Sequence, residues 1–262
     1  MALVTGGAGL LGRRYCEALI EAGGKVVVAD LDGARAEALA GELGSSVALG
    51  VGIDVSDEAS VRAAFDASVK HFGSMDILVN NAALTVRGGS ERLKDYFAPF
   101  EEYPRDLWDM ALSVNLTGMM LCAQSAGKQM LAQGGGVIVN ISSTYGVVGP
   151  DQRIYEGVKS PYADSGFNTP VSYAVTKTAV LGLTRYLATY WGQKNIRVNA
   201  LTPHGVYDNH DETFVRNFVY RSPMGRMARN DEYRGALLFL VSDASSYMTG
   251  SNLVVDGGWT AW

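Results

Sequence analysis

Short apolar segments alternate with longer helical patterns along most of this chain. Each short segment is almost wholly apolar, which is typical of strands that are covered on both faces of a sheet. Strands are expected at residues 2–4, 25–29, 46–51, 77–80, 136–141, 196–200 and 253–255. Helices are expected at residues 11–22, 34–43, 58–72, 106–133, 172–191 and 231–241. This repetition, with right-handed crossovers, predicts an α/β fold with a single doubly wound parallel sheet (Rossmann fold) and helices on both faces.

One domain accounts for the whole pattern. The chain has 262 residues, which suits one large α/β domain, and no break in composition marks a boundary. We therefore expect a single Rossmann-type domain over residues 1–262. Long irregular stretches lie at residues 84–104, 147–171 and 203–229. Because long loops in compact domains are usually functional lids or disordered, we expect these stretches to be insertions that border a substrate site.

Composition and charge exclude several classes of partner. The formal net charge is −5 and no basic block occurs, so nucleic acid is not an expected partner. No apolar run reaches the length of a membrane span, and no secretory signal precedes the first expected strand. Cys16 and Cys122 fall inside apolar helical patterns, which favours buried thiols in a reducing, cytoplasmic compartment. The three histidines are scattered, so no metal site is expected.

A glycine-rich turn follows the first expected strand and opens the first expected helix. Residues 5–12 read Thr-Gly-Gly-Ala-Gly-Leu-Leu-Gly, and they fit the dinucleotide fingerprint Gly-x-Gly-x-x-Gly from Gly7 onward. The glycines permit a tight turn, a close approach of the backbone to a pyrophosphate, and close packing of helix on strand. Free N–H groups at the start of the helix would hold the phosphates. The alternative is a glycine-rich turn without a ligand, which the flanking strand and helix disfavour.

An acidic residue is expected about twenty residues beyond such a turn. Asp30 ends the second expected strand, where its carboxylate would accept hydrogen bonds from the adenosine ribose and repel a 2′-phosphate. NAD is therefore the expected cofactor, and NADP is less favoured. Arg13 and Arg14 lie in the first helix, where we expect solvated charges; contact with a 2′-phosphate is the alternative.

Two further segments suit a dinucleotide. Asp54 and Val55 follow the third expected strand, where the aspartate could bond the adenine amino group; a cap for the next helix is the alternative. Asn81 and Ala82 follow the fourth strand, where small residues would let the cofactor pass.

Tyr173 and Lys177 are four residues apart in an expected helix, so they lie one turn apart on the same face. Tyrosine ordinarily ionises near pH ~10. An adjacent ammonium favours the phenolate, so we expect Lys177 to lower the pKa of Tyr173. Ser143 follows an apolar strand, which places a hydroxyl at the strand's end. Together with the glycine-rich turn, these residues point to hydride transfer on a nicotinamide cofactor.

Taken jointly, these motifs resemble the short-chain dehydrogenase/reductase family, in its short single-domain branch, over almost the whole chain. The resemblance is carried by residues 5–12, 80–83, 114–118, 141–143, 173–177, 198–203 and 248–258.

The resemblance implies a role for each catalytic residue. Tyr173 would be the general acid/base, and Lys177 would bind the nicotinamide ribose. Ser143 would hold the substrate oxygen, and it is chosen over Ser142 because the family's serine stands three residues before a glycine. Asn115 would anchor a water that links the lysine to solvent. The expected cofactor contacts are Gly6, Gly9, Leu10, Leu11, Asp30, Asp54, Val55, Asn81, Ala82, Tyr173, Lys177, Pro203, Gly205 and Val206.

Four features depart from the family pattern. The first turn has Leu10 in place of a usual glycine, and its glycine spacing resembles the family's longer, sugar-nucleotide branch. Ala83 replaces another usual glycine. The catalytic serine and tyrosine are 30 residues apart, well beyond the usual dozen or so. His204 stands between a proline and a glycine that are usually adjacent.

The expected function is NAD-dependent interconversion of a secondary alcohol and a ketone by hydride transfer. A sugar-nucleotide epimerase or dehydratase with tightly held NAD is the enzymatic alternative, suggested by the turn spacing. A dinucleotide-binding sensor or scaffold is the alternative without catalysis, and it would not need all four catalytic side chains.

The segment between Ser143 and Tyr173 is enlarged and polar, so we expect a polar small-molecule substrate from carbohydrate metabolism: a sugar, sugar acid or sugar phosphate. The expected substrate contacts are Ser143, Arg153, Tyr173 and His204. Arg153 would pair with a carboxylate or phosphate. A solvated loop or an oligomer contact is the alternative for the segment, and a histidine that only bonds backbone is the alternative for His204.

The C-terminal tail is apolar. Trp259 and Trp262 follow the last expected strand, and a tail of this kind usually needs a partner surface. In the resembling family the tail packs at a subunit interface, so a homodimer or homotetramer is expected.

Overall fold

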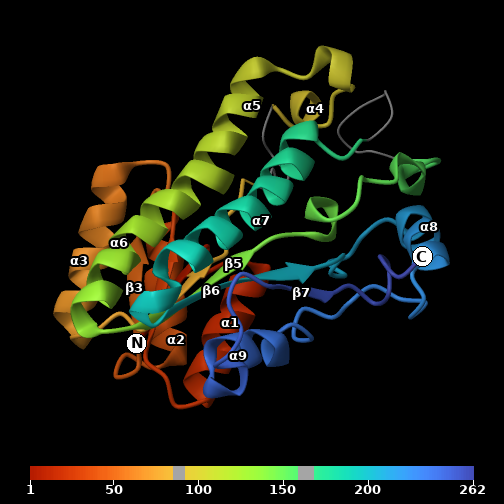
Figure 1. Cartoon of the computed structure of the whole chain (residues 1–262). Coiled ribbons are helices and arrows are strands. Elements are labelled where there is room, and N and C mark those ends of the chain that lie inside the picture. Colours follow the sequence, from red (N-terminus) through yellow and green to blue (C-terminus); the bar gives the residue numbers. More distant parts are fainter. Residues whose placement is uncertain (85–91, 159–167) are drawn as a thin grey trace.

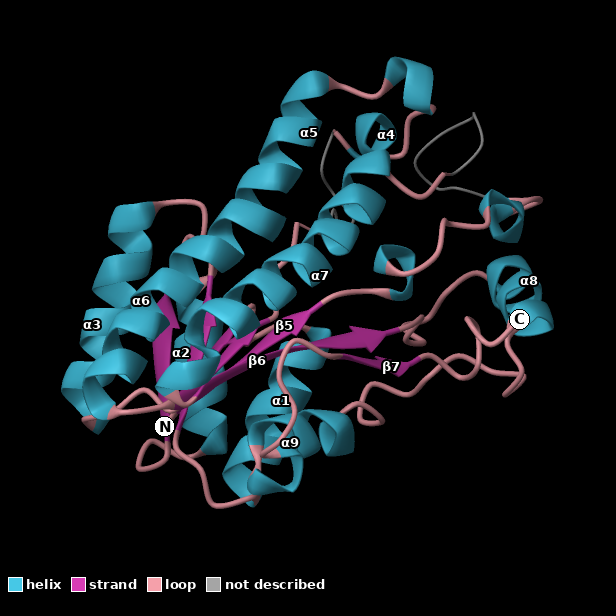
Figure 2. Ribbon diagram, viewed as in Figure 1, coloured by secondary structure: helices cyan, strands magenta, loops and turns pink. Residues whose placement is uncertain are grey.

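A computed structural model describes residues 1–84, 92–158 and 168–262, so parts of the expected insertions 84–104 and 147–171 lie outside the described residues (Figure 1). The described residues form one parallel sheet of seven strands in the order β3-β2-β1-β4-β5-β6-β7 (Figure 2). The strands are β1 (Ala2–Thr5), β2 (Val26–Asp30), β3 (Ala48–Gly52), β4 (Ile77–Asn80), β5 (Gly136–Ile141), β6 (Ile196–Pro203) and β7 (Asn252–Val255). The predicted fold class is confirmed.

Helices cover both faces of the sheet and bury an apolar layer on each side (Figure 1). One face carries α1 (Leu10–Glu21), α2 (Gly33–Leu43) and α9 (Arg234–Val241). The other carries α3 (Glu58–Phe72), α6 (Gly118–Gln133) and α7 (Val171–Trp191). Because both faces are covered, β1 and β2 are buried along nearly their whole length, which explains their unbroken apolar sequences. Among the described residues, no helix is both long and apolar enough to cross a membrane.

The strand order reverses between β1 and β4, and this reversal positions the site. β1 pairs with β2 on one side and with β4 on the other. The crossovers leave the sheet in opposite directions from this point, so a crevice opens at the carboxyl ends of the strands. The glycine-rich turn after β1 and residues 81–84 after β4 meet there.

The structure corrects the expected helix at residues 106–133. The segment consists of α5 (Arg105–Leu112), a wider π-helical turn (Ser113–Thr117) and α6, which lie in line in Figure 1. Such turns inside α-helices frequently mark functional sites. Here the turn contains Asn115, which is fully buried.

The expected irregular stretch at residues 203–229 contains a helix, α8 (Glu212–Arg221). Asp211 caps it by accepting hydrogen bonds from the backbone N–H groups of Thr213 and Phe214. Short helical segments also occur in the other stretches: α4 (Leu93–Tyr96), Phe100–Glu102 and Gln152–Tyr155. Residues between β6 and α8, together with Phe214 and Phe218 of α8, line one wall of the crevice.

The tail behaves differently from the expectation. Trp259 is only 3% exposed, because it packs within its own chain against Ile154, Phe218 and Met227. Trp262 alone is exposed. The prediction that both tryptophans need a partner surface is therefore wrong for Trp259.

Candidate active site

A cavity of about 830 Å³ opens at the carboxyl ends of the strands. Segments that follow β1, β2, β3, β4, β5 and β6 all contribute to its wall. Each residue expected to touch the cofactor lines it: Gly6, Gly9, Leu10, Leu11, Asp30, Asp54, Val55, Asn81, Ala82, Tyr173, Lys177, Pro203, Gly205 and Val206. The fold thus gathers into one cavity residues that are as far apart as 200 positions in the sequence.

The glycine-rich turn is shaped for a close approach by a ligand. Gly6 has φ +62°, a left-handed conformation that favours glycine. A Cβ at Gly12 would lie 2.1 Å from the Gly6 carbonyl oxygen, so a larger residue cannot stand there. α1 begins without a side-chain cap and has no acidic residue in its first turn. Its first N–H groups are therefore available to an anion, and these features fit the pyrophosphate of a dinucleotide.

The acidic residue after β2 is held firmly in place. The Asp30 carboxylate accepts hydrogen bonds from the backbone N–H of Ala8 at 3.0 Å and of Asp32 at 3.2 Å. The exposed Arg35 stands beside it and donates to the Ala8 carbonyl oxygen at 2.9 Å. Both Asp30 and Arg35 line the cavity, so a carboxylate and a guanidinium face the same end of it. The sequence analysis missed Arg35, although its place in the helix that follows Asp30 was a usable signal.

The other two arginines considered for this end are engaged elsewhere. Arg13 pairs with Glu17 and Glu42, and Arg14 pairs with Glu17 and bonds Asn230. Neither arginine lines the cavity. The interpretation of both as helix charges agrees with these contacts.

Two aspartates follow β3, and the structure shows which of them caps the next helix. Asp57 is the residue that caps α3, since its carboxylate accepts the N–H of Ala59 at 2.9 Å. Asp54 instead accepts hydrogen bonds from the backbone and hydroxyl of Ser56 at 2.9 and 2.6 Å. Asp54 also lines the cavity, so it lies where an adenine contact was expected.

Asn81 fastens the end of β4 to the glycine-rich turn. Its side-chain amide donates to the carbonyl oxygens of Thr5 and Gly6, at 2.9 and 3.1 Å. The Thr5 hydroxyl in return accepts the backbone N–H groups of Asn81 and Ala82, both at 3.0 Å. The cavity wall at the strand reversal is therefore rigidly braced.

Lys177 is buried at the bottom of the cavity. Its side chain is only 3% exposed, and Nζ donates to the carbonyl oxygen of Ile141, the last residue of β5, at 2.8 Å. Burial lowers the pKa of Lys177 to about 8, because the ammonium loses its hydration. Nζ lies 5.8 Å from the centre of the Tyr173 ring, so the two residues share one face of α7 as expected.

Tyr173 differs from the expectation in its ionisation. Burial raises the pKa of Tyr173 above its ordinary value, while a hydrogen bond from Ser143 opposes the increase. The prediction that Lys177 brings this pKa down is wrong for the structure as it stands, because loss of hydration costs the phenolate more than its neighbours return. The neutral phenol is therefore the resident form at neutral pH.

The structure distinguishes the two serines after β5. Ser143 hydrogen-bonds Tyr173 and lines the cavity, and its Oγ accepts the N–H of Tyr145 at 3.2 Å. Ser142 also lines the cavity, but its hydroxyl donates to the backbone carbonyl of Lys177 at 2.8 Å. Ser143 is thus the serine whose hydroxyl is directed to the phenol.

Asn115 lies behind the cavity rather than in its wall. Its Oδ1 accepts the backbone N–H of Leu84 at 2.6 Å, and its Nδ2 donates to the Thr176 hydroxyl at 3.1 Å. Thr176 precedes Lys177 on α7. Asn115 therefore connects the segment after β4 to α7, one residue before Lys177.

The expected substrate contacts separate into two groups. Ser143, Tyr173 and His204 line the cavity. Arg153 does not: it points into solvent and pairs with Asp151, which also pairs with Arg221. Several cavity residues were not identified from the sequence: Tyr145, Asp208, His210, Phe214, Phe218 and Met227. Tyr155, from the enlarged polar segment, also lines the cavity.

Among the described residues, no group of three or more His, Cys, Asp or Glu side chains could hold a metal ion. The arrangement instead defines a dinucleotide-binding protein with a serine, a tyrosine and a lysine at the far end of the cofactor site.

Comparison with known proteins agrees with this class. Residues 1–159 match the family model for short chain dehydrogenase, and residues 160–260 match that for Enoyl-(Acyl carrier protein) reductase. The chain is 37% identical to a D-threitol dehydrogenase of Mycolicibacterium smegmatis, over 99% of this chain and 92% of that protein. It is also 37% identical to a trans-4-hydroxycyclohexanecarboxylate dehydrogenase of Sinomonas cyclohexanicum, over 100% and 93%. A solved gluconate 5-dehydrogenase of Burkholderia cenocepacia, in complex with NADP and tartrate, matches with a TM-score of 0.85 and 32% identity, covering 100% of this chain and 95% of that one.

The chain belongs to the short-chain dehydrogenase/reductase family. It is an NAD(P)-dependent oxidoreductase that acts on CH–OH donors.

Replacing Tyr173 by Phe should abolish turnover while leaving NADH binding within about twofold of wild type, because the hydroxyl acts on the proton and not on the cofactor. Lys177→Ala should weaken both, since the ammonium is expected to hold the ribose. Steady-state rates and NADH fluorescence titration measure the two effects. Tyr190→Phe, which removes an exposed hydroxyl from the same helix, is the control. Retention of more than about a tenth of wild-type kcat by Tyr173→Phe, a loss below ~1.4 kcal/mol, contradicts the acid/base role.

Proposed function

We propose that this enzyme interconverts a secondary alcohol and a ketone with NAD(H), and that its substrate is a small polyhydroxylated or acidic molecule of the sugar type. The observation that carries the proposal is that Ser143, Tyr173 and the buried ammonium of Lys177 lie together in the wall of one dinucleotide-sized cavity.

The chain's own residues supply the proton chemistry. In reduction, Tyr173 donates its phenolic proton to the carbonyl oxygen while Ser143 donates a hydrogen bond to the same oxygen, and negative charge on that oxygen is neutralised as it forms. In oxidation, the ionised phenol accepts the alcohol proton. The nicotinamide supplies or accepts the hydride when it is bound. Lys177 and Asn115 form the proton path behind the tyrosine.

The preference for NAD over NADP rests on Asp30. Two backbone N–H groups hold its carboxylate at the adenosine end of the cavity, where it accepts ribose hydroxyls and repels a 2′-phosphate. Arg35 opposes this preference, because a guanidinium pairs well with phosphate. Asp30 is fixed from two sides by the backbone, while Arg35 is exposed and screened by solvent, so the carboxylate should dominate.

The substrate class is supported by the polar groups in the cavity and by the names of relatives. Tyr145, Tyr155, Asp208 and His210 bring donors and acceptors to the wall beyond Ser143. A fatty-acyl or steroid substrate would place apolar surface against this polar wall, which is a less favourable match than a polar substrate makes. The matched proteins named for threitol, a hydroxycyclohexanecarboxylate and gluconate act on polar alcohols of this size. Arg153 is paired with Asp151 and therefore gives no support to an acidic substrate.

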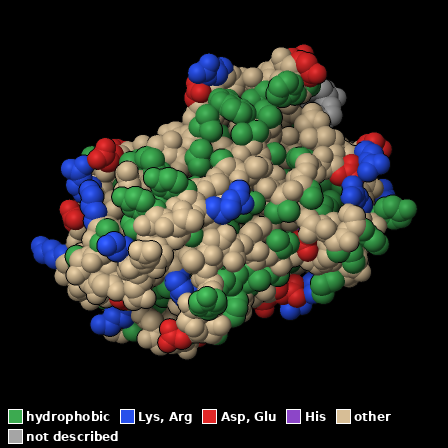
Figure 3. Space-filling view, viewed as in Figure 1, with side chains coloured by type: hydrophobic (Ala, Val, Ile, Leu, Met, Phe, Trp, Pro, Cys, Tyr) green, Lys and Arg blue, Asp and Glu red, His purple; other side chains and the backbone are tan. Residues whose placement is uncertain are grey.

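We also propose that the enzyme is a cytoplasmic homodimer or homotetramer. Figure 3 shows hydrophobic side chains gathered over α5, α6 and α7. Exposed apolar residues on these helices are Met110, Met120, Leu131, Val175, Tyr186 and Tyr190. A second copy of the chain would remove this surface from water. Both cysteines are free and buried, which agrees with a reducing compartment.

A substrate panel tests the reaction class. Polyols, sugars, sugar acids and steroids are each offered with NAD, and NADH formation is followed by absorbance. The proposal expects net NADH release with at least one polyol or sugar acid and none with steroids. Isomerisation of a sugar nucleotide without net NADH release would favour the epimerase alternative. Binding of NADH with no turnover across the panel in both directions would favour a sensor or scaffold.

The cofactor preference has its own test. Wild type should favour NAD over NADP in kcat/KM. Asp30→Ala should raise kcat/KM with NADP by about tenfold or more, because a repulsion worth ~1.4 kcal/mol is removed. Asp30→Asn, which keeps the size and the acceptor toward Ala8, controls for loss of shape.

Adding Arg35→Ala to Asp30→Ala should reverse the gain with NADP, since the guanidinium then no longer meets the phosphate. A wild-type enzyme that favours NADP would show that Arg35 controls this end of the cavity and that the role given to Asp30 is wrong.

A further inference from the structure

The imidazole of His204 carries a polar atom that the protein leaves without a partner. Its Nε2 is shielded from solvent, and no donor or acceptor among the described residues lies within hydrogen-bonding distance. A buried nitrogen in this state costs free energy unless a ligand or an ordered water completes its hydrogen bonds. His204 lines the same cavity as Ser143 and Tyr173, so the residue borders the space that a bound substrate would occupy.

Aromatic rings fix the imidazole in one place. The ring centre of His204 lies 4.3 Å from that of Trp259 and 4.7 Å from that of Phe218, and these two rings also contact each other at 4.8 Å. Tyr145 approaches edge-on at 5.9 Å. Gly205 has no side chain, and a Cβ there would lie 2.6 Å from the Phe218 ring, so the packing leaves no room for a larger residue. The imidazole therefore cannot turn away to find a partner in solvent.

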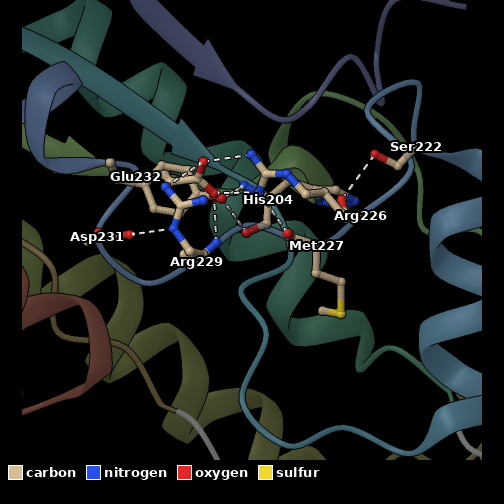
Figure 4. Close-up of polar contacts among 8 residues, drawn as sticks. His204, Ser222, Arg226, Met227, Arg229, Asp231 and Glu232 are labelled. Atoms are coloured by element: carbon tan, nitrogen blue, oxygen red, sulfur yellow. Dashed lines mark hydrogen bonds and ion pairs between the residues drawn. The ribbon is translucent and has the colours of Figure 1, made fainter.

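The backbone of His204 is held just as firmly. The Tyr233 hydroxyl accepts its N–H at 3.2 Å and donates to its carbonyl oxygen at 2.9 Å. Tyr233 follows Glu232, which forms a bidentate pair with Arg226 and accepts the backbone N–H of Arg229. Figure 4 shows these side chains converging beside His204. The position of His204 is therefore fixed by these hydrogen bonds as well as by the packing of the aromatic rings.

The charges around His204 determine which kind of substrate group can hydrogen-bond to Nε2. Burial lowers the pKa of His204 to about 4, so the imidazole is neutral at physiological pH. The carboxylate of Asp256 lies close enough to act on it electrostatically. The cation on the other side of the aromatic cluster, Arg221, lies over the Trp259 ring and is already paired with Asp151. A neutral ring with a carboxylate nearby disfavours an anionic group and suits a hydroxyl, which can donate or accept.

We propose that His204 determines substrate specificity by hydrogen-bonding a second hydroxyl group of the substrate, while Ser143 and Tyr173 hold the reacting oxygen. The inference rests on the proposed function, because it needs a secondary alcohol in this cavity. It narrows the substrate class from sugar-like molecules in general to neutral polyhydroxy compounds. Sites that hydrogen-bond a substrate hydroxyl reject analogues without it strongly, since the protein group is then left unpaired.

Threitol and secondary butanol test the proposal as a matched pair, because they share a four-carbon chain and a secondary alcohol but only threitol has further hydroxyls. Wild type should favour threitol in kcat/KM by about a hundredfold. His204→Phe keeps a ring in the aromatic cluster and removes both nitrogens. It should lower kcat/KM for threitol about tenfold or more, chiefly through KM, and lower that for secondary butanol by a much smaller factor.

His204→Gln provides a rescue, because its amide can again bond a hydroxyl; it should restore part of the preference. Thermal melting of each variant shows whether the fold is kept. An equal loss on both alcohols in His204→Phe, or an undiminished preference for threitol, overturns the proposal and indicates a purely structural histidine.

Imidazole nitrogen NMR gives a readout that does not depend on turnover. The chain has three histidines, and His204→Phe identifies the signals of interest. With NADH bound, threitol should shift the Nε2 resonance of His204 and secondary butanol should not. If threitol shifts the resonance but no alcohol of the substrate panel is oxidised, the proposed function fails, and only the binding of a hydroxyl by His204 stands. If threitol is oxidised and the resonance does not move at saturation, the inference fails and the function stands.

Discussion

The hydrogen bond from the buried ammonium of Lys177 to the carbonyl oxygen of Ile141 positions the residues that we propose to be catalytic. A charge that is 3% exposed must be hydrogen-bonded, or the protein loses several kcal/mol of solvation without return. The bond pins α7 to the last residue of β5. Ser143, two residues beyond that strand, and Tyr173, one helical turn before the lysine, are brought together as a consequence. The serine–tyrosine contact is therefore set by a helix–strand junction and not by the loop between them.

This junction also explains how a long insertion is tolerated. Of the 29 residues between Ser143 and Tyr173, the described ones are anchored to the fold at two points. Near its start, the insertion packs through Ile154 against Phe218 and Trp259. Near its end, Thr169 bonds Gln152 and Tyr155. The free-energy cost of closing a loop grows only slowly with its length. The insertion can therefore reshape the substrate wall without disturbing the placement of Ser143 beside Tyr173.

Much of the fold and cofactor site could be predicted from local sequence. Strands buried on both faces have unmistakable apolar sequences, and the glycine-rich turn is dictated by backbone geometry that glycine alone allows, so Gly6 and Gly12 were identifiable in advance. Contacts between segments that are far apart in the sequence could not be predicted. The burial of Trp259 depends on α8, whose cap at Asp211 and apolar spacing of Phe214 and Phe218 were overlooked inside an apparent loop. Arg153 was expected to be free for a substrate, but it forms an ion pair with Asp151. The same carboxylate also pairs with Arg221, a contact between distant segments that the sequence does not reveal.

The ionisation of Tyr173 could not be read from spacing at all. Spacing identifies the neighbouring cation, but the pKa also depends on how much water the phenol loses, and only the folded structure shows that this loss dominates. The result is a protonated acid beside a lysine whose pKa of about 8 keeps most of its charge at neutral pH. Such a pair is ready to protonate a carbonyl oxygen, and it must lose a proton before it can oxidise an alcohol.

The pH dependence of kcat/KM in the two directions, measured on one substrate pair, tests this account most directly. Oxidation requires the ionised tyrosine, so its rate should rise with pH from about pH 6 toward a plateau near or above about pH 10. Reduction requires the phenol, and burial raises the pKa of Tyr173 above its ordinary value, so the reduction rate should stay flat over most of this range and fall only above about pH 10. An oxidation rate that is flat or falls over this range would contradict the assignment of Tyr173 as the group that moves the proton.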